Sequence, residues 1–397
     1  CYFCILFYNL LSKTGITMNL KSPLEMLYKW ESEAPDKVYM RQPINGVYKE
    51  WTWKETATET RKMAAVLKGL NLPPQTKIGI LSKNCAHWIM SDLAIMMSGH
   101  ISIPMYPNLS PNSVKQILDH SETKVLFVGK LDDYASMKPG VREYVYCITY
   151  PFYSEKGYDT WDDLTANVEL VTENVIRAPE ELSTIIYTSG TTGIPKGVMH
   201  KFHNFSFAST YAINTVKVGP NDTFFSYLPL CHIAEKILVE MGGIYSGGRV
   251  DFAESLDTFA QNLAYSSPTV FLGVPRIWTK FQQGILAKLP QKKMDMLLGI
   301  PFIGGLIKKK VRKGLGLNDA KNVFTGAAPT PEVLIKWFEK LGIYIQEAYA
   351  MTENCCYSHV TLNTKIKIGY VGTPLPYCDA KISEEGEILI KHEALMD

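Results

Sequence analysis

The sequence predicts an α/β fold in which mainly parallel β-sheets are flanked by helices. Two observations support this class. Short apolar runs of strand length alternate with stretches of helical period, and turns rich in Gly and Pro separate them. Such alternation requires crossover connections, which make the strands parallel and cover both faces of the sheet. A chain of 397 residues, 46% hydrophobic and 20% charged, is long enough for two or three domains.

The first half of the chain shows the alternation clearly. An amphipathic stretch covers Pro23–Glu33, and helical spacing continues over Lys54–Leu70. Pro73-Pro74 ends that pattern, and the next run, Lys77–Leu81, has the composition of a buried strand. The elements that follow are expected to be a helix over Ala86–Ser98, a strand over Ile101–Met105, a helix over Ser113–His120 and a strand over Lys124–Val128.

The alternation resumes at Thr184–Tyr187, a strand that leads into a segment rich in Gly and Thr. Later strands are predicted over Thr223–Leu228, Arg249–Phe252, Thr269–Gly273, Asn322–Thr325 and Tyr344–Ala348, with a helix over Pro331–Leu341. Short β segments then follow over Lys365–Gly369, Cys378–Ile382 and Glu387–Lys391. We therefore expect an α/β domain with two sheet subdomains over residues 18–360 and the start of a small β subdomain over 361–397.

Net charge and cysteine spacing argue against some classes of function for this protein. A formal net charge of +2 gives no electrostatic reason to expect a nucleic-acid partner. The eight cysteines lack the paired spacing of a zinc site and suit a reducing cytosol. The apolar start, Cys1–Leu11, is too short to span a bilayer and lacks the basic start of a signal peptide. We expect residues 1–17 to be a leader before the true start at Met18, with membrane anchoring as the alternative.

The segment Tyr187–Gly197, YTSGTTGIPKG, has the composition of a phosphate-binding loop. Its glycines permit close backbone approach to a ligand, its hydroxyls and amides offer donors to phosphate oxygens, and its lysine adds a positive charge. Pro195 stands where a Walker A loop needs Gly, so this is not a P-loop. A flexible polar loop is the alternative. The expected phosphate-binding residues are Thr188, Ser189, Gly190, Thr191, Thr192, Gly193 and Lys196.

Two further segments follow predicted strands. Gln346–Glu353, QEAYAMTE, combines an aromatic ring that can stack on adenine with oxygen ligands that suit Mg²⁺. Phe324–Pro329, FTGAAP, has small residues that let a flat ring lie against the backbone. Because ligands bind at the carboxyl ends of the strands in open parallel sheets, both segments are well placed for a site. Alone, each is also compatible with an ordinary strand end or strand–helix turn.

A fourth segment, Tyr227–Glu235, contains His232 among apolar neighbours. Such a histidine is either a satisfied structural residue or part of a site. A fifth, Leu297–Gly316, consists of an apolar run followed by a cluster of basic residues. It is either a solvated basic helix end or a membrane-surface patch over Leu297–Lys313 that attracts anionic head groups. A cytoplasmic location is expected, with peripheral membrane contact as the alternative.

The first four segments together resemble the motifs of the adenylate-forming superfamily, which includes acyl-CoA synthetases, luciferases and peptide-synthetase adenylation domains. The resemblance runs from about Met18 to the last residue. The LPLCHIA run within Tyr227–Glu235 and the GVPRIW run at Gly273–Trp278 are similar to the long-chain fatty acid–CoA ligase branch. The resemblance implies that residues 18–360 form the large AMP-binding N-terminal domain of that fold.

The resemblance also implies roles for individual residues. Tyr349 would pack on adenine, Thr352 would contact the nucleotide phosphate, Glu353 and Thr188 would bind Mg²⁺, and His232 would border the acyl carboxylate. Lys196, Glu353 and His232 are thus the expected catalytic residues. The remaining expected nucleotide contacts are Gly326, Ala327, Ala328, Pro329, Glu347, Ala348, Ala350 and Met351, with Ala350 standing where the family has Gly.

The activity implied by the resemblance is ATP-dependent conversion of a long-chain fatty acid to an acyl-AMP and then to an acyl-CoA. ATP, Mg²⁺ and CoA are the implied cofactor and co-substrates, and the fatty acid and CoA are the implied partners. The family's later Thr-Gly-Asp stretch and its C-terminal Lys do not occur in these 397 residues. We therefore expect a fragment of a longer protein, without the small C-terminal domain and poorly active. An enzyme for another carboxylic acid and a non-catalytic nucleotide-binding module are the alternatives.

Overall fold

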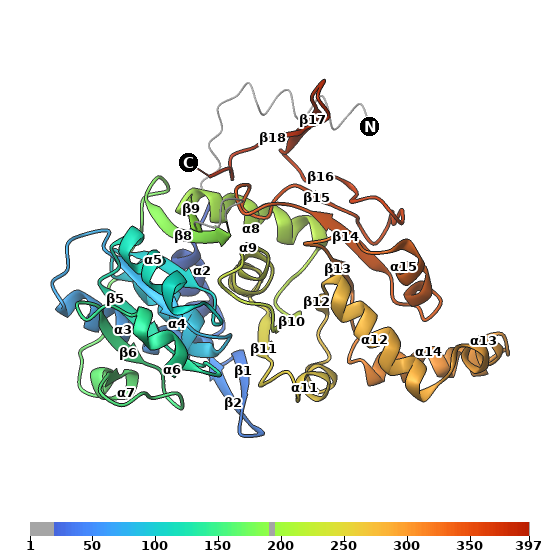
Figure 1. Cartoon of the computed structure of the whole chain (residues 1–397), viewed down its shortest axis with the longest axis horizontal. Coiled ribbons are helices and arrows are strands. Elements are labelled where there is room, and N and C mark those ends of the chain that lie inside the picture. The colour runs from blue at the N-terminus through green and yellow to red at the C-terminus, as the bar shows by residue number, and fades with distance from the viewer. Residues whose placement is uncertain (1–19, 190–194, 397) are drawn as a thin grey trace.

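The computed structural model describes residues 20–189 and 195–396. The expected leader, residues 1–17, and the loop residues Gly190, Thr191, Thr192 and Gly193 lie outside the described residues. The described chain forms two large sheets that lie side by side with helices around them, and a small hairpin stands at the C-terminal end (Figure 1). The predicted α/β class is therefore confirmed.

The first sheet has seven strands in the order β7-β6-β5-β3-β4-β8-β9, and only its last pair is antiparallel. Its strands are β3 (Lys77–Leu81), β4 (Ile101–Met105), β5 (Val125–Val128), β6 (Tyr146–Thr149), β7 (Asp159–Thr160), β8 (Leu182–Ser189) and β9 (Pro195–Lys201). The helical segments of this part are α3 (Trp53–Gly69), α4 (Ala86–Met97), α5 (Pro111–Ser121), α6 (Tyr134–Met137), the 3-10 turn η1 (Lys138–Gly140) and α7 (Trp161–Thr165).

The second sheet has nine strands in the order β16-β15-β14-β13-β12-β10-β11-β1-β2. Its strands are β1 (Val38–Ile44), β2 (Val47–Thr52), β10 (Thr223–Ser226), β11 (Arg249–Phe252), β12 (Val270–Leu272), β13 (Asn322–Thr325), β14 (Ile345–Tyr349), β15 (His359–Val360) and β16 (Thr373–Pro374). The central strands are parallel, whereas β2, β15 and β16 join antiparallel at the edges.

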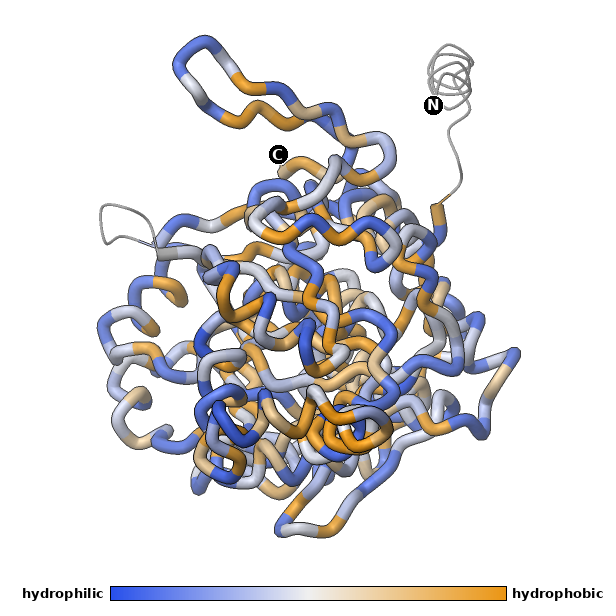
Figure 2. Tube along the Cα trace, turned by 90° about the vertical axis from the view of Figure 1, so that its right-hand side faces the viewer, coloured by the Kyte–Doolittle hydropathy of each residue, from blue (hydrophilic) through white to orange (hydrophobic). Residues whose placement is uncertain are grey.

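The remaining helices are α2 (Pro23–Glu33), α8 (Phe202–Val216), α9 (Ile233–Glu235), the π-helix η2 (Lys236–Met241), α10 (Gly242–Ser246), α11 (Phe259–Ser266), α12 (Pro275–Lys288), α13 (Gln291–Leu298), α14 (Ile303–Gly314) and α15 (Glu332–Glu339). The antiparallel pair β17 (Asp379–Ile382) and β18 (Ile388–Lys391) forms the separate hairpin, which stands clear of the body at the top of Figure 2.

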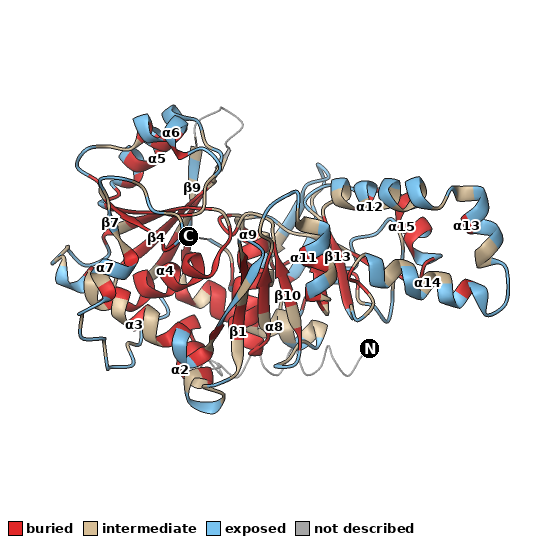
Figure 3. Ribbon diagram, turned by 90° about the horizontal axis from the view of Figure 1, so that it is seen from below, coloured by how far each residue is buried: buried red, intermediate tan, exposed pale blue. Residues whose placement is uncertain are grey.

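Local sequence explains where several helices begin. Ser22 and Glu25 form a capping box at the start of α2, and Thr52 and Glu55 form another at the start of α3. Helix α4 differs because all of its residues are buried. A helix without a solvent face lies within the core, and its one acidic residue, Asp92, is paired there with Lys236. Buried residues fill the sheets, whereas α13 and α14 extend outward with exposed surfaces (Figure 3).

Two sequence predictions need correction. The strand predicted over Lys365–Gly369 is wrong, since that segment forms turns. Gly369 has a left-handed φ of 82°, and its amide donates to the Glu347 carboxylate at 2.8 Å instead of to a neighbouring strand. The predicted loop Tyr187–Gly197 is strand at both ends, because Thr188 and Lys196 face each other in the β8–β9 hairpin. Among the described helices, none is both long and apolar enough to cross a bilayer.

Candidate active site

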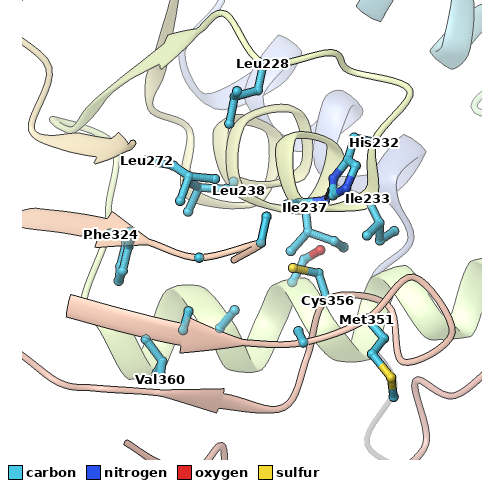
Figure 4. Close-up of a pocket in the computed structure, with 18 of the residues that line it drawn as sticks. Leu228, His232, Ile233, Ile237, Leu238, Leu272, Phe324, Met351, Cys356 and Val360 are labelled. Atoms are coloured by element: carbon cyan, nitrogen blue, oxygen red, sulfur yellow. Dashed lines mark hydrogen bonds between the residues drawn. The ribbon is translucent and has the colours of Figure 1, made fainter. Parts of the chain in front are cut away.

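A cavity of about 660 Å³ lies at the carboxyl ends of the parallel strands of the second sheet. Side chains of the α9–η2 segment, including Ile237 and Leu238, face Phe324 and Val360 of the sheet across it (Figure 4). The segments that follow β10, β12, β13 and β14 all contribute to its wall. Open parallel sheets place their ligands at this edge, so this cavity is the candidate site.

The polar rim of the cavity joins residues from both sheets. Thr188 comes from β8 of the first sheet, whereas Thr352 and Glu353 follow β14 of the second. The predicted residues that line the cavity are Thr188, His232, Gly326, Ala327, Ala348, Ala350, Met351, Thr352 and Glu353. Segments separated by more than a hundred positions in the sequence thus meet at one surface.

A buried histidine connects these two sheets. His200 on β9 is fully buried, and its Nε2 lies 2.9 Å from the backbone oxygen of Thr352. Burial lowers the pKa of His200 to about 4, so the ring is neutral near pH 7 and Nε2 carries the proton that it donates. This bond ties the strand that carries Lys196 to the turn that carries Glu353. This contact was not predicted, because a lone histidine in a sequence carries no signal of its partner.

The turn after β14 has its own internal support. Cys355 and Cys356 both adopt left-handed backbone conformations, with φ of 52° and 54°. The Asn354 side chain is buried and accepts a hydrogen bond from the Met351 amide at 2.9 Å. The backbone oxygen of Glu353 accepts one from the Met396 amide at 2.8 Å. These contacts fix the backbone that presents Glu353 at the rim.

Close backbone approach explains the small residues of the FTGAAP segment. A Cβ added to Gly326 would lie 3.1 Å from the backbone oxygen of Ala348, so the two strand ends are nearly in contact. Ala327 has a left-handed φ of 64° and lines the cavity, whereas Ala328 and Pro329 are exposed and lie outside its lining.

His232 combines the two roles that the sequence left open. It lines the cavity and also caps α9, since its Nδ1 accepts the Ala234 amide at 3.2 Å. Burial lowers its pKa, which favours the neutral ring. The preceding loop is held by Asn84, whose Nδ2 donates to the Leu228 oxygen at 2.6 Å and whose Oδ1 accepts the Leu230 amide at 3.1 Å. His232 therefore has a fixed position on the wall.

Buried carboxyl groups lie behind this wall. Glu235 is 1% exposed and accepts the Tyr227 amide at 2.9 Å, and burial raises its pKa to about 8. Fully buried Lys236 contacts Asp92 at 2.6 Å and Glu240 at 2.9 Å. Burial would lower the pKa of Lys236, but the two carboxylates outweigh it and the pKa is raised. These charges support η2 instead of lining the cavity.

The remaining predicted residues lie apart from the lining. Lys196 is exposed on β9 opposite Thr188. Glu347 accepts the Gly369 amide, and burial raises its pKa. The Tyr349 ring lies 6.1 Å from that of His359, centre to centre. Stacking of Tyr349 on adenine and phosphate contact by Lys196 stay predictions. Ser189 and the loop up to Gly193 are outside the side chains that the structure describes.

Most of the apolar wall was missed from the sequence. It includes Ala212, Ile213 and Val216 on α8 and Val270 and Leu272 on β12. The α8 residues recur at helical spacing, which predicts a buried face but not what that face contacts. Cys356 and His359 also line the cavity. Both follow the QEAYAMTE segment closely but lie outside it, so that motif did not mark them.

The rim of the cavity offers two oxygen ligands that suit Mg²⁺. Thr188 and Glu353 supply a hydroxyl and a carboxylate to the same cavity. Among the described residues, no group of three or more His, Cys, Asp or Glu side chains is placed to hold a metal. Mg²⁺ commonly takes only one or two protein oxygens and fills the other positions with phosphate and water oxygens. The rim fits a nucleotide-borne Mg²⁺.

Comparisons with known proteins agree with this geometry. The chain is 27% identical to the long-chain-fatty-acid–CoA ligase FadD15 of Mycobacterium tuberculosis over 92% of its own length and 66% of the relative's. It is 27% identical to the long-chain-fatty-acid–CoA ligase heimdall of Drosophila melanogaster, covering 86% and 58% of the two chains. The chain thus spans about three fifths of the length of such relatives.

Solved structures share the fold. The anthranilate CoA ligase AuaEII, solved with anthranoyl-AMP, superimposes with a TM-score of 0.79 at 18% identity, over 96% of this chain and 71% of that one. The N-terminal domain of FACL13 from Mycobacterium tuberculosis superimposes with a TM-score of 0.75 at 20% identity, over 95% of this chain and 90% of that one. The sequence pattern of the family described as AMP-binding enzyme matches residues 27–397. The chain therefore belongs to the AMP-binding enzyme family.

Proposed function

We propose that this chain is the nucleotide- and acid-binding part of a ligase that converts a long-chain fatty acid to an acyl-AMP and then to an acyl-CoA. The main support for this proposal is a single cavity that has polar residues at Thr188, Thr352 and Glu353 and an otherwise mainly apolar wall. The rim suits nucleotide phosphates, and the wall suits a hydrocarbon chain. The names of the relatives support the same substrate class.

The reaction begins with attack of a carboxylate oxygen on the α-phosphorus of ATP. The bond between the α-phosphorus and its bridging oxygen breaks, and pyrophosphate leaves with the electron pair. The CoA thiolate then attacks the acyl carbon of the mixed anhydride, and AMP leaves. The first step brings two anions together, so the site must provide cations and hydrogen-bond donors at the phosphates.

The position of each residue suggests its role in this reaction. Lys196 supplies a positive charge beside the β8–β9 hairpin, and Thr188 and Thr352 supply hydroxyl donors at the rim. Glu353, with Thr188, would hold Mg²⁺, which when bound neutralises phosphate charge. His232 borders the apolar wall as a neutral ring, where it would face the acyl carboxylate.

The cavity favours a hydrocarbon chain over an amino acid. Its wall on α8, η2 and β12 is apolar, and Glu353 at the rim is the only acidic side chain among the described residues that line it. An amino group deep in this cavity would therefore have no carboxylate partner, and burying an unpaired charge is costly. Each buried methylene of a fatty acid instead contributes about 0.8 kcal/mol.

The test is acid-dependent ATP–pyrophosphate exchange by the full-length protein. Over saturated acids of increasing length, kcat/KM should rise by about fourfold per methylene until the cavity is filled. Lys196→Ala should reduce exchange strongly, whereas Lys54→Ala, at another exposed lysine, should not. Best activity with amino acids or short acids would overturn the long-chain assignment. ATP binding without exchange for any acid would favour a non-catalytic module.

A further inference from the structure

The α13–α14 hairpin carries an exposed apolar tip that the proposed function does not use. The tip consists of Met296, Ile300, Phe302, Ile303 and Leu306, with side-chain exposures of 59%, 38%, 93%, 39% and 67%. These residues are contiguous along the end of α13, the connecting turn and the first turn of α14. The hairpin extends from the end of the molecule farthest from the first sheet (Figure 3). Exposed apolar residues grouped in this way mark an interaction site more often than chance exposure does.

Phe302 is the most informative residue of this tip. It is almost fully exposed and has a positive φ of 64°. A bulky side chain in this backbone region is strained, and Gly would occupy it at lower cost. Neither packing within the described chain nor the backbone conformation explains a phenylalanine here. Contact with an apolar phase outside the chain does explain it.

Basic residues surround the apolar tip. Residues 291–314 contain seven Lys or Arg and one Asp, a net formal charge of +6 in a chain whose total is +2. On α14 the exposed side chains continue from Phe302 and Leu306 to Lys309, Lys310 and Lys313 along one face. Apolar residues at the tip and lysines farther along the same face fit a surface of anionic lipid.

The two helices of the hairpin pack closely on each other, and a hydrogen bond joins the hairpin to α15. Gly304 lies so close to α13 that an added Cβ would meet the Leu298 oxygen at 2.6 Å. Trp337 on α15 donates to Gln291 at 2.8 Å. Helix α12, which leads to the hairpin, begins directly after Val274 of the cavity wall and is about 21 Å long at 1.5 Å per residue.

We propose that the α13–α14 hairpin docks the protein on an anionic lipid surface, with the apolar tip in the interface and the lysines at the head groups. A second copy of the chain is a poorer occupant, because two faces of charge +6 would repel each other. The inference extends the proposed function without depending on it, since lipid binding needs neither ATP nor the acid. If both hold, the surface that supplies the fatty acid lies one helix away from the cavity.

The test is sedimentation of the purified chain with vesicles of phosphatidylcholine, alone or mixed with phosphatidylserine, in low and high salt. Binding should require phosphatidylserine and weaken as salt rises. The double variant Phe302→Ser/Leu306→Ser should lower the affinity by at least about tenfold. Its matched control is Leu256→Ser/Val333→Ser, which changes two other exposed apolar residues of 86% and 79% exposure and should bind like the unchanged chain.

A second pair of variants tests the charges. Lys309→Glu/Lys310→Glu/Lys313→Glu should lower the affinity by at least about a hundredfold, since each basic residue near an anionic surface contributes about fivefold. Lys54→Glu/Lys68→Glu/Lys115→Glu has the same net charge change at exposed lysines elsewhere and should have a much smaller effect. Residues 1–17 are unchanged in every variant. Equal losses in variant and control, or binding that ignores the tip substitutions, would overturn the proposal. So would a dimer that dissociates on Phe302→Ser/Leu306→Ser without any lipid binding.

Discussion

The Nε2 atom of His200 lies 2.9 Å from the backbone oxygen of Thr352, although 152 positions separate the two residues in the sequence. His200 belongs to β9 of the first sheet, and Thr352 follows β14 of the second. Lys196 lies four residues before His200 on the same strand, and Glu353 directly follows Thr352. This hydrogen bond therefore sets the relative position of the two segments expected to bind the nucleotide.

Replacing His200 with Phe should weaken both the fold and nucleotide binding. Phe fills the buried space but leaves the Thr352 oxygen without its donor, which costs about 1–3 kcal/mol of unfolding free energy. We expect that loss in urea unfolding and a decrease of about tenfold in ATP affinity by calorimetry. His200→Gln retains a donor and should lose less. Equal ATP affinity in His200→Phe and the unchanged chain would show that the bond does not position the site.

Stability should fall as the pH drops below about 6.5. Burial lowers the pKa of His200 to about 4 and that of His87 to about 3, whereas both rings titrate near 6.5 when unfolded. Between these values the unfolded chain binds more protons than the folded chain, so acid favours unfolding. The full loss of unfolding free energy is at most about 3 kcal/mol for His200 and about 5 kcal/mol for His87.

This pH dependence can be assigned by substitution. His87 is enclosed by the rings of Trp51, Tyr150 and Trp161 at 5.1–5.8 Å between centres. His87→Phe should flatten the dependence of unfolding free energy on pH between 6.5 and 4, measured by urea unfolding at a series of pH values. An unchanged slope in this variant would mean that His87 is already protonated in the folded state.

Glu235 should give stability the opposite pH dependence, with a loss as the pH rises. Burial raises its pKa to about 8 in the folded chain, above the usual 4.5, so its contribution is complete below 4.5 and is lost as the pH rises towards 8. Glu235→Gln keeps an oxygen for the Tyr227 amide and cannot ionise. At pH 8–9 the variant should be more stable than the unchanged chain by up to about 5 kcal/mol, and near pH 4.5 the two should be similar.

Lys236→Met should strongly destabilise the fold. Lys236, Asp92 and Glu240 are fully buried, so removing the cation leaves two carboxyl groups without their partner. Loss of one member of a buried ion pair typically costs about 3–5 kcal/mol of unfolding free energy. The triple variant Lys236→Met/Asp92→Asn/Glu240→Gln should recover part of this loss in urea unfolding. Lys54→Met, at an exposed lysine, is the control and should change stability little.

Ala212→Phe should shorten the acyl chains that the full-length protein prefers. Ala212 lines the apolar wall on α8, and a larger side chain there would occupy cavity volume. If the variant excludes two methylenes, kcat/KM for the longest acids should fall by about fifteenfold while short acids are unaffected. Asn214→Phe adds the same side chain at an exposed position of α8 and is the control. A uniform decrease for all acids in Ala212→Phe would point to a misfolded helix instead.

Local sequence was sufficient for many strands and for five of the helices, whereas long helices such as α8 and α12 were not predicted. Capping boxes at Ser22 and Thr52 mark helix starts, and β-branched, apolar runs such as Lys77–Leu81 become the central strands. One predicted strand is wrong: Lys365–Gly369 has an alternating pattern that resembles a strand but forms none. The Gly369 amide donates to the Glu347 carboxylate, 22 positions earlier in the sequence, instead of to a neighbouring strand. Pattern alone contains no information about such a partner.

The sequence by itself determined the α/β class, many of the strands and helices, and the motifs that contain Thr188, His232, Gly326 and Glu353, because periodicity and turn chemistry act between near neighbours. Only the tertiary structure decided that these motifs share one cavity, that His200 holds Thr352, and that Lys236 meets Asp92 across 144 positions. It also left Phe302 exposed at the tip of the α13–α14 hairpin. The physical reason is that contacts between distant segments depend on how whole sheets and helices pack, which no local pattern specifies.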